Sequence, residues 1–254
     1  MGQTETPIRT ATPTEANTRG SSIILISAVP RARAVSSTHT PSLVGLVIAG
    51  GYSTRFGEAD KAVADLAGTP MIRRVVDRLA LLTDSVVVNC REDQHEAIRG
   101  ALEGCTPEIR FAFDPVDDQG PVAGIRTGLE ALEREYAAVV ACDMPFVDPA
   151  LFEVLLERAR EHDTSADAAG ADAALVKLED GWYQTTQALY RTDAMAHACG
   201  DALAVDDGRI LSALERLEYV TVNGDTLERA GIDETSFESI DTREALEAAA
   251  DRLE

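Results

Sequence analysis

The stretch Leu43 to Lys61, LVGLVIAGGYSTRFGEADK, decides the fold of this chain of 254 residues. It begins with an apolar run, Leu43 to Ile48, which is typical of a β-strand buried on both faces of a sheet. The run ends at Ala49-Gly50-Gly51, where small side chains let a ligand approach the backbone N–H groups closely. Arg55 and Lys61 follow and add positive charge. Together these features predict a binding site for a phosphorylated ligand.

Lys61 is one of two lysines, the other being Lys177, among 23 Lys and Arg residues. A chain with so little lysine keeps one at the end of its glycine loop, which favours a functional role over an ordinary surface position. The loop is not a P-loop, because Lys61 is followed by Ala62 instead of Ser or Thr. It is not a dinucleotide fingerprint either, because Ala49 to Tyr52 does not supply GxGxxG.

The composition is strongly acidic, with a formal net charge of −21. The acidic residues are spread over all segments, and no basic stretch offsets them, so nucleic acids and anionic membranes are not expected partners. Abundant acid with scarce lysine resembles the surfaces of proteins from halophilic archaea; an ordinary acidic protein is the alternative. The four cysteines form no CxxC pair, which indicates reduced thiols in a cytoplasmic protein instead of a zinc site or a disulfide framework.

Residues 1–41 differ from the rest of the chain. They are rich in Thr, Ser, Ala, Pro and Arg, which predicts a disordered N-terminal extension or a start codon assigned too early. A secretory signal is not favoured, because the apolar run Ile23 to Ile26 is short and is followed by Pro30 and two arginines. Residues 42–254 are expected to form one domain, and no stretch is long and apolar enough to span a membrane.

Strands and helices are expected to alternate after the glycine loop. The expected strands are 84–90, 109–113 and 137–143, and the expected helices are 71–82, 92–102, 125–135 and 149–161. This alternation predicts an α/β, Rossmann-like fold, in which a mostly parallel central sheet carries helices on both faces.

The last third of the chain is expected to add a small β-hairpin insertion. Its strands, 173–178 and 182–190, are joined by Glu179-Asp180-Gly181, a typical turn sequence. The further expected elements are helices at 191–199 and 207–215, short strands at 219–222 and 237–240, and a terminal helix opened by Asp241.

Three expected strands end on polar side chains, namely Asn89, Asp114 and Asp143. The carboxyl ends of parallel strands line the ligand crevice of an open sheet, so these side chains should converge with the glycine loop. Asp143 is the best candidate for a Mg²⁺ ligand, because Mg²⁺ prefers carboxylate and phosphate oxygens.

The other polar residues have two interpretations each. Asp114 contacts a ribose or a phosphate-bound water, or it closes an Asp-Pro turn. Asn89 faces a base or closes a turn. Asp241 is a second metal ligand or the N-cap of the last helix.

Several motifs occur in the order found in the MobA-like nucleotidyltransferases. The segment Ile48 to Lys61 resembles the nucleotide loop of that family, roughly LAGGxSxRMGxDK, with Phe56 at the usual methionine position. Other segments that resemble family motifs are Leu66 to Met71 (LxGxPM), Gly120 to Gly124 (GPLAG), Ala141 to Phe146 (CCDMPF) and Phe237 to Leu246 (FxNxNTPEDL). In the last segment Ser239 and Asp241 replace asparagines, and Arg243 replaces a proline. The resemblance is closest to the branch that guanylates the molybdenum cofactor.

The resemblance implies a Rossmann-like nucleotidyltransferase that couples GTP to molybdopterin with Mg²⁺ as cofactor and pyrophosphate as product. The residues implied in GTP binding are Ile48, Ala49, Gly50, Gly51, Lys61, Asn89, Asp114 and Asp143, with Asp143 also on Mg²⁺. Arg55, Lys61 and Asp143 are the expected catalytic groups. Transient contact with molybdenum cofactor enzymes or insertion proteins is also expected.

No protein nucleophile is needed for such a reaction, because an acceptor phosphate is already anionic and can attack the α-phosphate in line. Three alternatives stay open. They are transfer from CTP to the same cofactor, transfer to a sugar phosphate or cobinamide phosphate, and nucleotide binding without catalysis. The presence of both Lys61 and Asp143 argues against the last, and the lack of GxGxxG argues against a Rossmann oxidoreductase.

Overall fold

A computed structural model describes residues 43–51, 56, 60–114, 120–162, 170–179, 181–205 and 208–253. All of them lie in one compact unit, His39–Glu254. The predicted extension, residues 1–41, lies outside the described residues, and so does Arg55. Both predictions therefore stay predictions.

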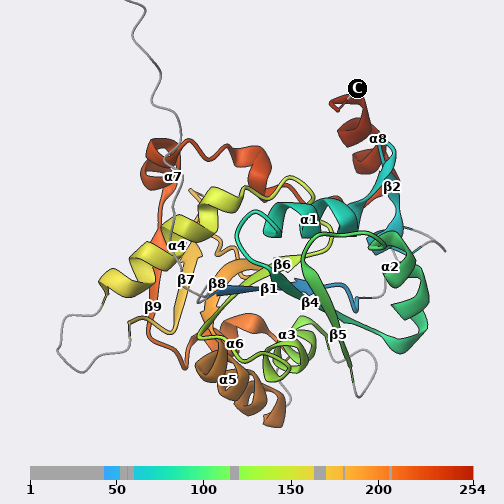
Figure 1. The fold of residues 1–254 in the computed structure, drawn as a ribbon. Coiled ribbons are helices and arrows are strands. Elements are labelled where there is room, and N and C mark those ends of the chain that lie inside the picture. Colours follow the sequence, from blue (N-terminus) through green and yellow to red (C-terminus); the bar gives the residue numbers. More distant parts are fainter. Residues whose placement is uncertain are drawn as a thin grey trace, which may run out of the picture. The chain divides into compact units, whose positions relative to one another are not determined.

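The unit is built on a seven-stranded sheet with the order β5-β4-β1-β6-β8-β7-β9 (Figure 1). The strands are β1 (Leu43–Ile48), β4 (Ser85–Cys90), β5 (Glu108–Phe113), β6 (Tyr136–Ala141), β7 (Ala173–Val176), β8 (Gln187–Arg191) and β9 (Tyr219–Val222). Neighbouring strands in this sheet are parallel, except that β8 runs antiparallel to β6 and to β7. The prediction of a mostly parallel central sheet is confirmed.

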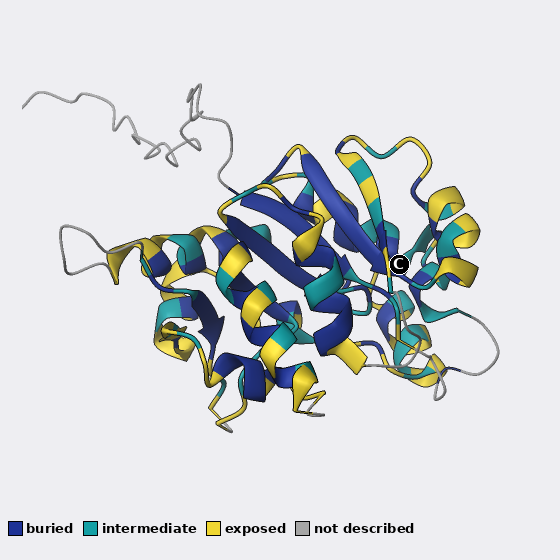
Figure 2. Ribbon diagram, turned by 90° about the horizontal axis from the view of Figure 1, so that it is seen from below, coloured by how far each residue is buried: buried dark blue, intermediate teal, exposed yellow. Residues whose placement is uncertain are grey.

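Helices cover both faces of this sheet, as predicted. The helices are α1 (Met71–Leu79), α2 (His95–Ala101), α3 (Gly120–Glu130), α4 (Pro149–Glu161), α5 (Thr192–Ala204), α6 (Ile210–Leu214), α7 (Gly224–Ala230) and α8 (Arg243–Asp251). Helices α1, α2, α4 and α7 pack on one face, and α3, α5 and α6 pack on the other. Figure 2 shows the buried strands in dark blue between helices whose outer faces are exposed.

The sequence of β1 explains this two-sided packing. Val44 and Leu46 enter the core on the α3 side, whereas Val47 enters the core on the α1 side. Because side chains alternate across a strand, a strand covered on both sides must be apolar throughout. The continuous apolar run in the sequence is therefore the expected signature of the central strand.

The predicted hairpin is present, but its antiparallel strands β7 and β8 belong to the central sheet instead of a separate insertion, and β8 begins at Gln187 instead of at residue 182. A second, two-stranded sheet pairs β2 (Asp65–Leu66) with β3 (Thr69–Pro70). The turn between β2 and β3 places Ala67 and Gly68 at positive φ, 49° and 79°. This hairpin directly precedes α1.

Three details differ from the sequence-based expectation. Helix α3 begins at Gly120, so the GPVAG motif forms its first turns instead of a loop. Pro121 suits this place, because the missing N–H of proline is not needed in a first helical turn. The strand expected at 237–240 is absent from the described fold, and a 3₁₀ turn, Glu234–Phe237, stands before it. Helix α7 was not expected, although its cap Asn223 and its terminating residue Gly231 are typical signals.

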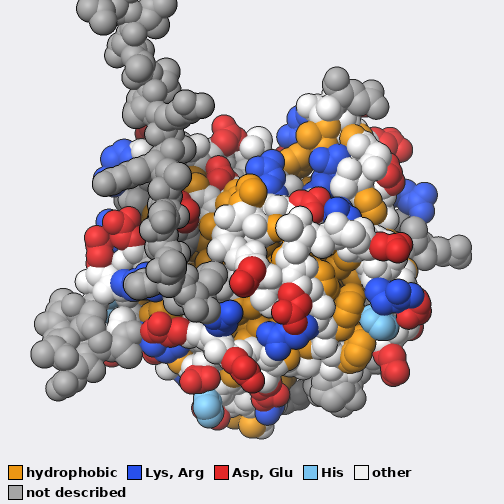
Figure 3. All heavy atoms as spheres, viewed as in Figure 1, with side chains coloured by type: hydrophobic (Ala, Val, Ile, Leu, Met, Phe, Trp, Pro, Cys, Tyr) orange, Lys and Arg blue, Asp and Glu red, His pale blue; other side chains and the backbone are white. Residues whose placement is uncertain are grey.

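The acidic side chains are scattered over the face of the molecule seen in Figure 3 and alternate there with basic ones. This agrees with the even spread of acid along the chain. Among the described helices, none has the length and apolar character needed to cross a lipid bilayer.

Candidate active site

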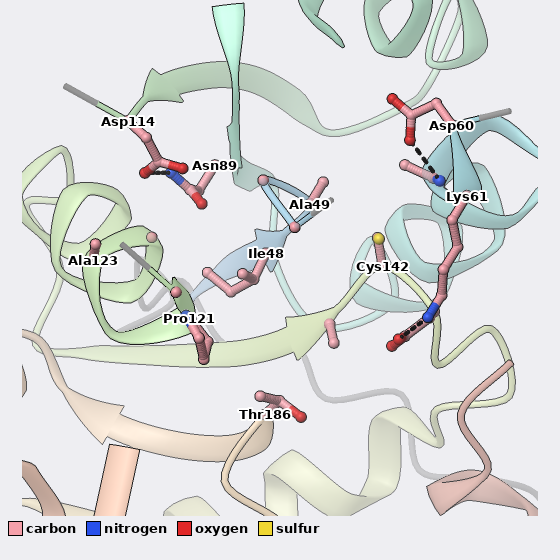
Figure 4. Close-up of a pocket in the computed structure, with 17 residues that line it drawn as sticks. Ile48, Ala49, Asp60, Lys61, Asn89, Asp114, Pro121, Ala123, Cys142 and Thr186 are labelled. Atoms are coloured by element: carbon pink, nitrogen blue, oxygen red, sulfur yellow. Dashed lines mark hydrogen bonds and ion pairs between the residues drawn. The ribbon is translucent and has the colours of Figure 1, made fainter. Parts of the chain in front are cut away.

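A pocket of about 260 Å³ lies at the carboxyl ends of β1, β4 and β6 (Figure 4). Its walls include all the described residues that the sequence placed in a nucleotide site: Ile48, Ala49, Gly50, Gly51, Lys61, Asn89, Asp114 and Asp143. They come from four separate stretches of the chain. Parallel strands bring them together, because their carboxyl ends meet at one edge of the sheet.

At one end of the pocket, Asn89 and Asp114 form a polar pair. The amide of Asn89 donates to the carbonyl of Ala112 at 3.2 Å and to Asp114 Oδ1 at 2.7 Å. Asn89 is fully buried, and its Oδ1 has no hydrogen-bond partner. A carbonyl oxygen without a partner is costly to bury. This end of the pocket thus offers an unmet acceptor next to a carboxylate.

The first turn of α3 comes close to this pair because it carries a glycine. A Cβ atom at Gly124 would stand 2.4 Å from Asn89 Oδ1, which is closer than such atoms can approach. Gly124 therefore makes room for the side chain of Asn89 itself. Pro121 and Ala123 line the same side of the pocket (Figure 4).

At the other end, Lys61 joins two carboxylates. Its Nζ lies 2.5 Å from Asp143 Oδ2 and 2.5 Å from Asp241 Oδ1. Burial alone lowers the pKa of Lys61, but the attraction and hydrogen bonds of Asp143 and Asp241 outweigh it and raise the pKa above its ordinary value. Lys61 is therefore a cation at neutral pH, and it joins Asp143 in the middle of the sequence to Asp241 near its carboxyl end.

The structure rules out one of the two interpretations of Asp241. The N-cap of α8 is Thr242, whose hydroxyl accepts from the N–H of Ala245 at 3.1 Å. The capping interpretation of Asp241 is therefore wrong. Asp143 does not cap a helix either, since α4 is capped by Asp148.

The donor set of Asp143 and Asp241 suits a magnesium ion. Among the described residues no group of three or more His, Cys, Asp and Glu side chains could hold a metal. Mg²⁺, however, is commonly held by one or two carboxylates, with phosphate oxygens and waters completing the shell. Asp143 and Asp241, which both contact the ammonium of Lys61, supply two such carboxylates.

The C-terminal segment closes this end of the site. The N–H of Ile240 donates to the carbonyl of Asp143 at 2.9 Å, and this bond replaces the strand pairing expected at 237–240. Arg243 Nε donates to the carbonyl of Phe56 at 3.1 Å. Phe56, only 3% exposed, packs in a small core with Ile240 and with Ala249 of α8. The segment thus contacts both the nucleotide loop and the Asp143 loop.

Sequence reasoning missed Arg91, Gln94 and Thr186. Arg91 and Gln94 donate to backbone carbonyls of the glycine loop. Thr186, which directly precedes β8, lines the pocket between its two ends (Figure 4). No motif marks these positions. The one available signal was the run of polar residues directly after Asn89 at the end of a strand.

Cys142 is also in the wall of the pocket, next to Asp143. Burial, with a further contribution from the nearby charge of Asp143, raises the pKa of its thiol far above the ordinary value. A thiol that stays protonated is a poor nucleophile. This agrees with the expectation that the chemistry needs no protein nucleophile.

The MobA-like NTP transferase domain matches residues 45–220, which include the glycine loop, Asn89, Asp114 and Asp143. This chain belongs to the MobA-like NTP transferase family. It is thus a nucleotidyltransferase, and the predicted family resemblance is confirmed.

Relatives within the MobA-like family carry more specific names. A protein of Natronomonas pharaonis named probable molybdenum cofactor guanylyltransferase is 47% identical over 209 residues, which cover 82% of this chain and 97% of that protein. The crystal structure of molybdopterin-guanine dinucleotide biosynthesis protein A from Archaeoglobus fulgidus is 25% identical, with a TM-score of 0.66 over 83% of this chain and 98% of that one.

The fold extends beyond this family. The structure of 4-diphosphocytidyl-2C-methyl-D-erythritol synthase from Anaerococcus prevotii matches with a TM-score of 0.59 at 17% identity, over 83% of this chain and 95% of that one. At this identity the likeness shows the shared fold alone. Together with the Archaeoglobus structure, this likeness confirms the predicted α/β, Rossmann-like fold.

Proposed function

We propose that this chain transfers GMP from GTP to the phosphate of molybdopterin and releases pyrophosphate. The observation that carries the proposal is the convergence of Lys61, Asp143 and Asp241 at one end of a pocket whose other end holds Asn89 and Asp114. The names of its relatives support the choice of GTP and molybdopterin.

In this proposal the nucleotide lies along the pocket. The base occupies the end with Asn89 and Asp114, where two oxygens can accept hydrogen bonds from N–H groups of a purine edge. The triphosphate occupies the end with Gly51 and Lys61 and extends to Gly50, which lies between the two ends and adjoins Asp114. Arg55, which adjoins Phe56 in the sequence, is proposed as a further cation for the phosphates.

The reaction is a direct displacement at phosphorus. An oxygen of the acceptor phosphate attacks the α-phosphorus, and the bond from that phosphorus to the bridging oxygen of the β-phosphate breaks. Pyrophosphate leaves with the bonding electron pair. The protein positions two anions and offsets the negative charge that builds up between them, and Lys61 supplies a charge for this from a rigid support.

Asp143 and Asp241 would hold Mg²⁺, which when bound supplies positive charge at the phosphates. In the free protein the ammonium of Lys61 balances the same two carboxylates. We propose that the phosphates take over Lys61 when the nucleotide enters, so that the carboxylates become available to the metal. Cytoplasmic location and transient contact with molybdenum cofactor enzymes or insertion proteins stay predictions.

The test is pyrophosphate release by the purified full-length chain in molar KCl with Mg²⁺ and molybdopterin, comparing GTP, CTP and ATP. We expect release with GTP alone. Release with CTP instead would show that the protein transfers CMP, not GMP, to molybdopterin. No release with any nucleotide would overturn the proposed acceptor. Asp143→Asn, which keeps the size of the side chain, is the control for release by a contaminant.

A further inference from the structure

The three carbonyl groups that follow β1 are held by two side chains from the segment after β4. Arg91 Nη1 donates to the carbonyls of Gly50 at 3.0 Å and Gly51 at 3.2 Å. Gln94 Nε2 donates to the carbonyl of Ala49 at 3.1 Å. Three successive peptide oxygens are thus fixed by side chains instead of by a neighbouring strand.

Fixing these oxygens also fixes the N–H groups that follow them. In a planar trans peptide the C=O of one residue and the N–H of the next point in opposite directions. The bond from Gln94 to Ala49 therefore sets the N–H of Gly50, and the bond from Arg91 to Gly50 sets the N–H of Gly51. Both glycines line the pocket, and within the described part of the chain neither N–H donates a hydrogen bond.

Arg91 and Gln94 are themselves held firmly. Gln94 is only 4% exposed, and its Oε1 accepts from the N–H of Arg91 at 3.1 Å. Arg91 Nε donates to Asp93 Oδ1 at 3.0 Å, and the Arg91 side chain is 11% exposed. A buried, doubly bonded amide and a guanidinium fork have few alternative rotamers. They are therefore suited to hold a backbone in one orientation.

Gln94 also reaches the turn that carries Lys61. Its Nε2 donates to Asp60 Oδ2 at 2.8 Å, and Asp60 Oδ1 accepts from the N–H of Ala62 at 3.0 Å as the N-cap of the turn Lys61–Val63. The Gln94 amide thus contacts two parts of the phosphate end. These are the backbone of the glycine loop and the N-cap of the turn that carries Lys61.

We propose that Arg91 and Gln94 are positioning residues that turn the Gly50 and Gly51 N–H groups toward the phosphates of the nucleotide. They touch the backbone and need not touch the ligand. Two N–H groups that diverge from fixed carbonyls form a concave anion site, and the charge of Arg91 behind them adds to its positive potential. This inference rests on the proposed nucleotide site and concerns the phosphate end alone.

The test compares ligands with and without phosphates. Calorimetry in molar KCl measures the Kd of GTP, and ligand-observed NMR measures the weaker binding of guanosine. For Arg91→Ala and Gln94→Leu in the full-length chain, we expect the Kd of GTP to rise at least about 10-fold, in line with the loss of charge-assisted or buried hydrogen bonds. The Kd of guanosine should change less than about 2-fold, since both variants keep Asn89 and Asp114.

Two further variants separate positioning from damage to the fold. Arg91→Lys keeps the charge but not the forked donor, so its Kd for GTP should lie between those of the wild type and Arg91→Ala. Arg99→Ala removes an exposed arginine that is paired with Glu96, so it should bind GTP as the wild type does. Thermal unfolding of each free variant reports its stability.

The outcomes distinguish this inference from the proposed function. If the wild type binds GTP and the Arg91 and Gln94 variants bind it equally well, the positioning role is wrong. A parallel loss of GTP and guanosine binding would also overturn it, because the effect would then be on the whole pocket. If the wild type itself binds no nucleotide, the proposed function fails first.

Discussion

The two ends of the pocket are built on different principles. At the end with Asn89 and Asp114, an amide is bonded to neighbouring oxygens and keeps one buried oxygen without a partner. At the end with Lys61, two carboxylates and an ammonium satisfy one another. The first end is ready to receive a ligand as it stands. The second is closed on itself, so a ligand must exchange its internal ion pairs for new ones.

Because of this difference, substitutions at the two ends should affect different kinetic constants. A change at the charged end removes a group that acts on the reacting phosphates and leaves its partners uncompensated. A change at the Asn89 end removes one contact to a part of the ligand that does not react. The first should lower kcat, and the second should chiefly raise KM.

The largest effect is expected for Asp143→Ala. Loss of this carboxylate removes a proposed metal ligand and one of the two partners of Lys61. We expect turnover to fall by at least about 1,000-fold, at the upper end of the effect of removing one electrostatic group. Steady-state pyrophosphate release measures turnover, and thermal unfolding checks the fold. Unchanged turnover in a folded variant would show that Asp143 is not a ligand of the metal.

Lys61→Ala should have the next largest effect, a fall of about 100-fold in kcat/KM for GTP. It should also tighten binding of Mg²⁺ to the nucleotide-free protein, because the ammonium that balances Asp143 and Asp241 is gone. Calorimetry with MgCl₂ alone measures this second effect. Weaker Mg²⁺ binding would contradict the idea that lysine and metal compete for the same oxygens.

Asp114→Ala tests the other end. It removes the carboxylate that accepts from Asn89 and is proposed to contact the nucleoside. We expect KM for GTP to rise about 10-fold while kcat stays within about 2-fold of the wild-type value. Initial rates over a range of GTP concentrations separate the two constants. A fall in kcat without a change in KM would contradict the prediction that substitutions at the two ends affect different kinetic constants.

The pH dependence of stability gives a smaller effect. In the folded state, the attraction and hydrogen bonds of Asp143 and Asp241 raise the pKa of Lys61 above its ordinary value of 10.5. A raised pKa means that its stabilising contribution is complete below about pH 10.5 and is lost as pH rises through the folded-state value. The difference in Tm between wild type and Lys61→Ala should therefore be constant from pH 7 to about pH 9.5 and shrink above. A difference that already declines near pH 8 would show that Lys61 is not held by the two carboxylates.

The smallest effect is expected from deleting residues 1–41, which belong to neither end of the pocket. Pyrophosphate release by the shortened chain should equal that of the full chain, and its thermal unfolding should be unchanged. A chain that fails to fold after this deletion would show that the extension is structural.

The architecture and half of the site were predictable because both depend on strand pattern. Apolar runs that end on Asn89 and Asp143 indicate parallel strands, and parallel strands bring their ends together. The roles of Arg91, Gln94 and Arg243 were not predictable in this way. Each of them bonds to a backbone carbonyl of a distant segment. Such a bond leaves no pattern of residue types in either partner.

Two elements were predicted wrongly for related reasons, namely the strand at 237–240 and the start of α3. The segment around Ile240 has the alternation of a short strand, but its N–H bonds to the loop after β6 instead of to an edge of the sheet. The start of α3 was placed too late because glycine and proline are common in loops. Here Gly120 begins the helix at a φ of 75°, and Pro121 occupies its first turn.

The pairing of Lys61 with Asp241 has a consequence for biosynthesis. All seven strands of the sheet precede residue 223, whereas Asp241 and the contacts of Ile240 and Arg243 come later in the chain. A polypeptide emerging from the ribosome can therefore complete its sheet while the charged end still lacks its second carboxylate. A chain interrupted by a premature stop between these points would contain all seven strands but would lack core residues such as Leu227 and Ile232 and the charge balance around Lys61.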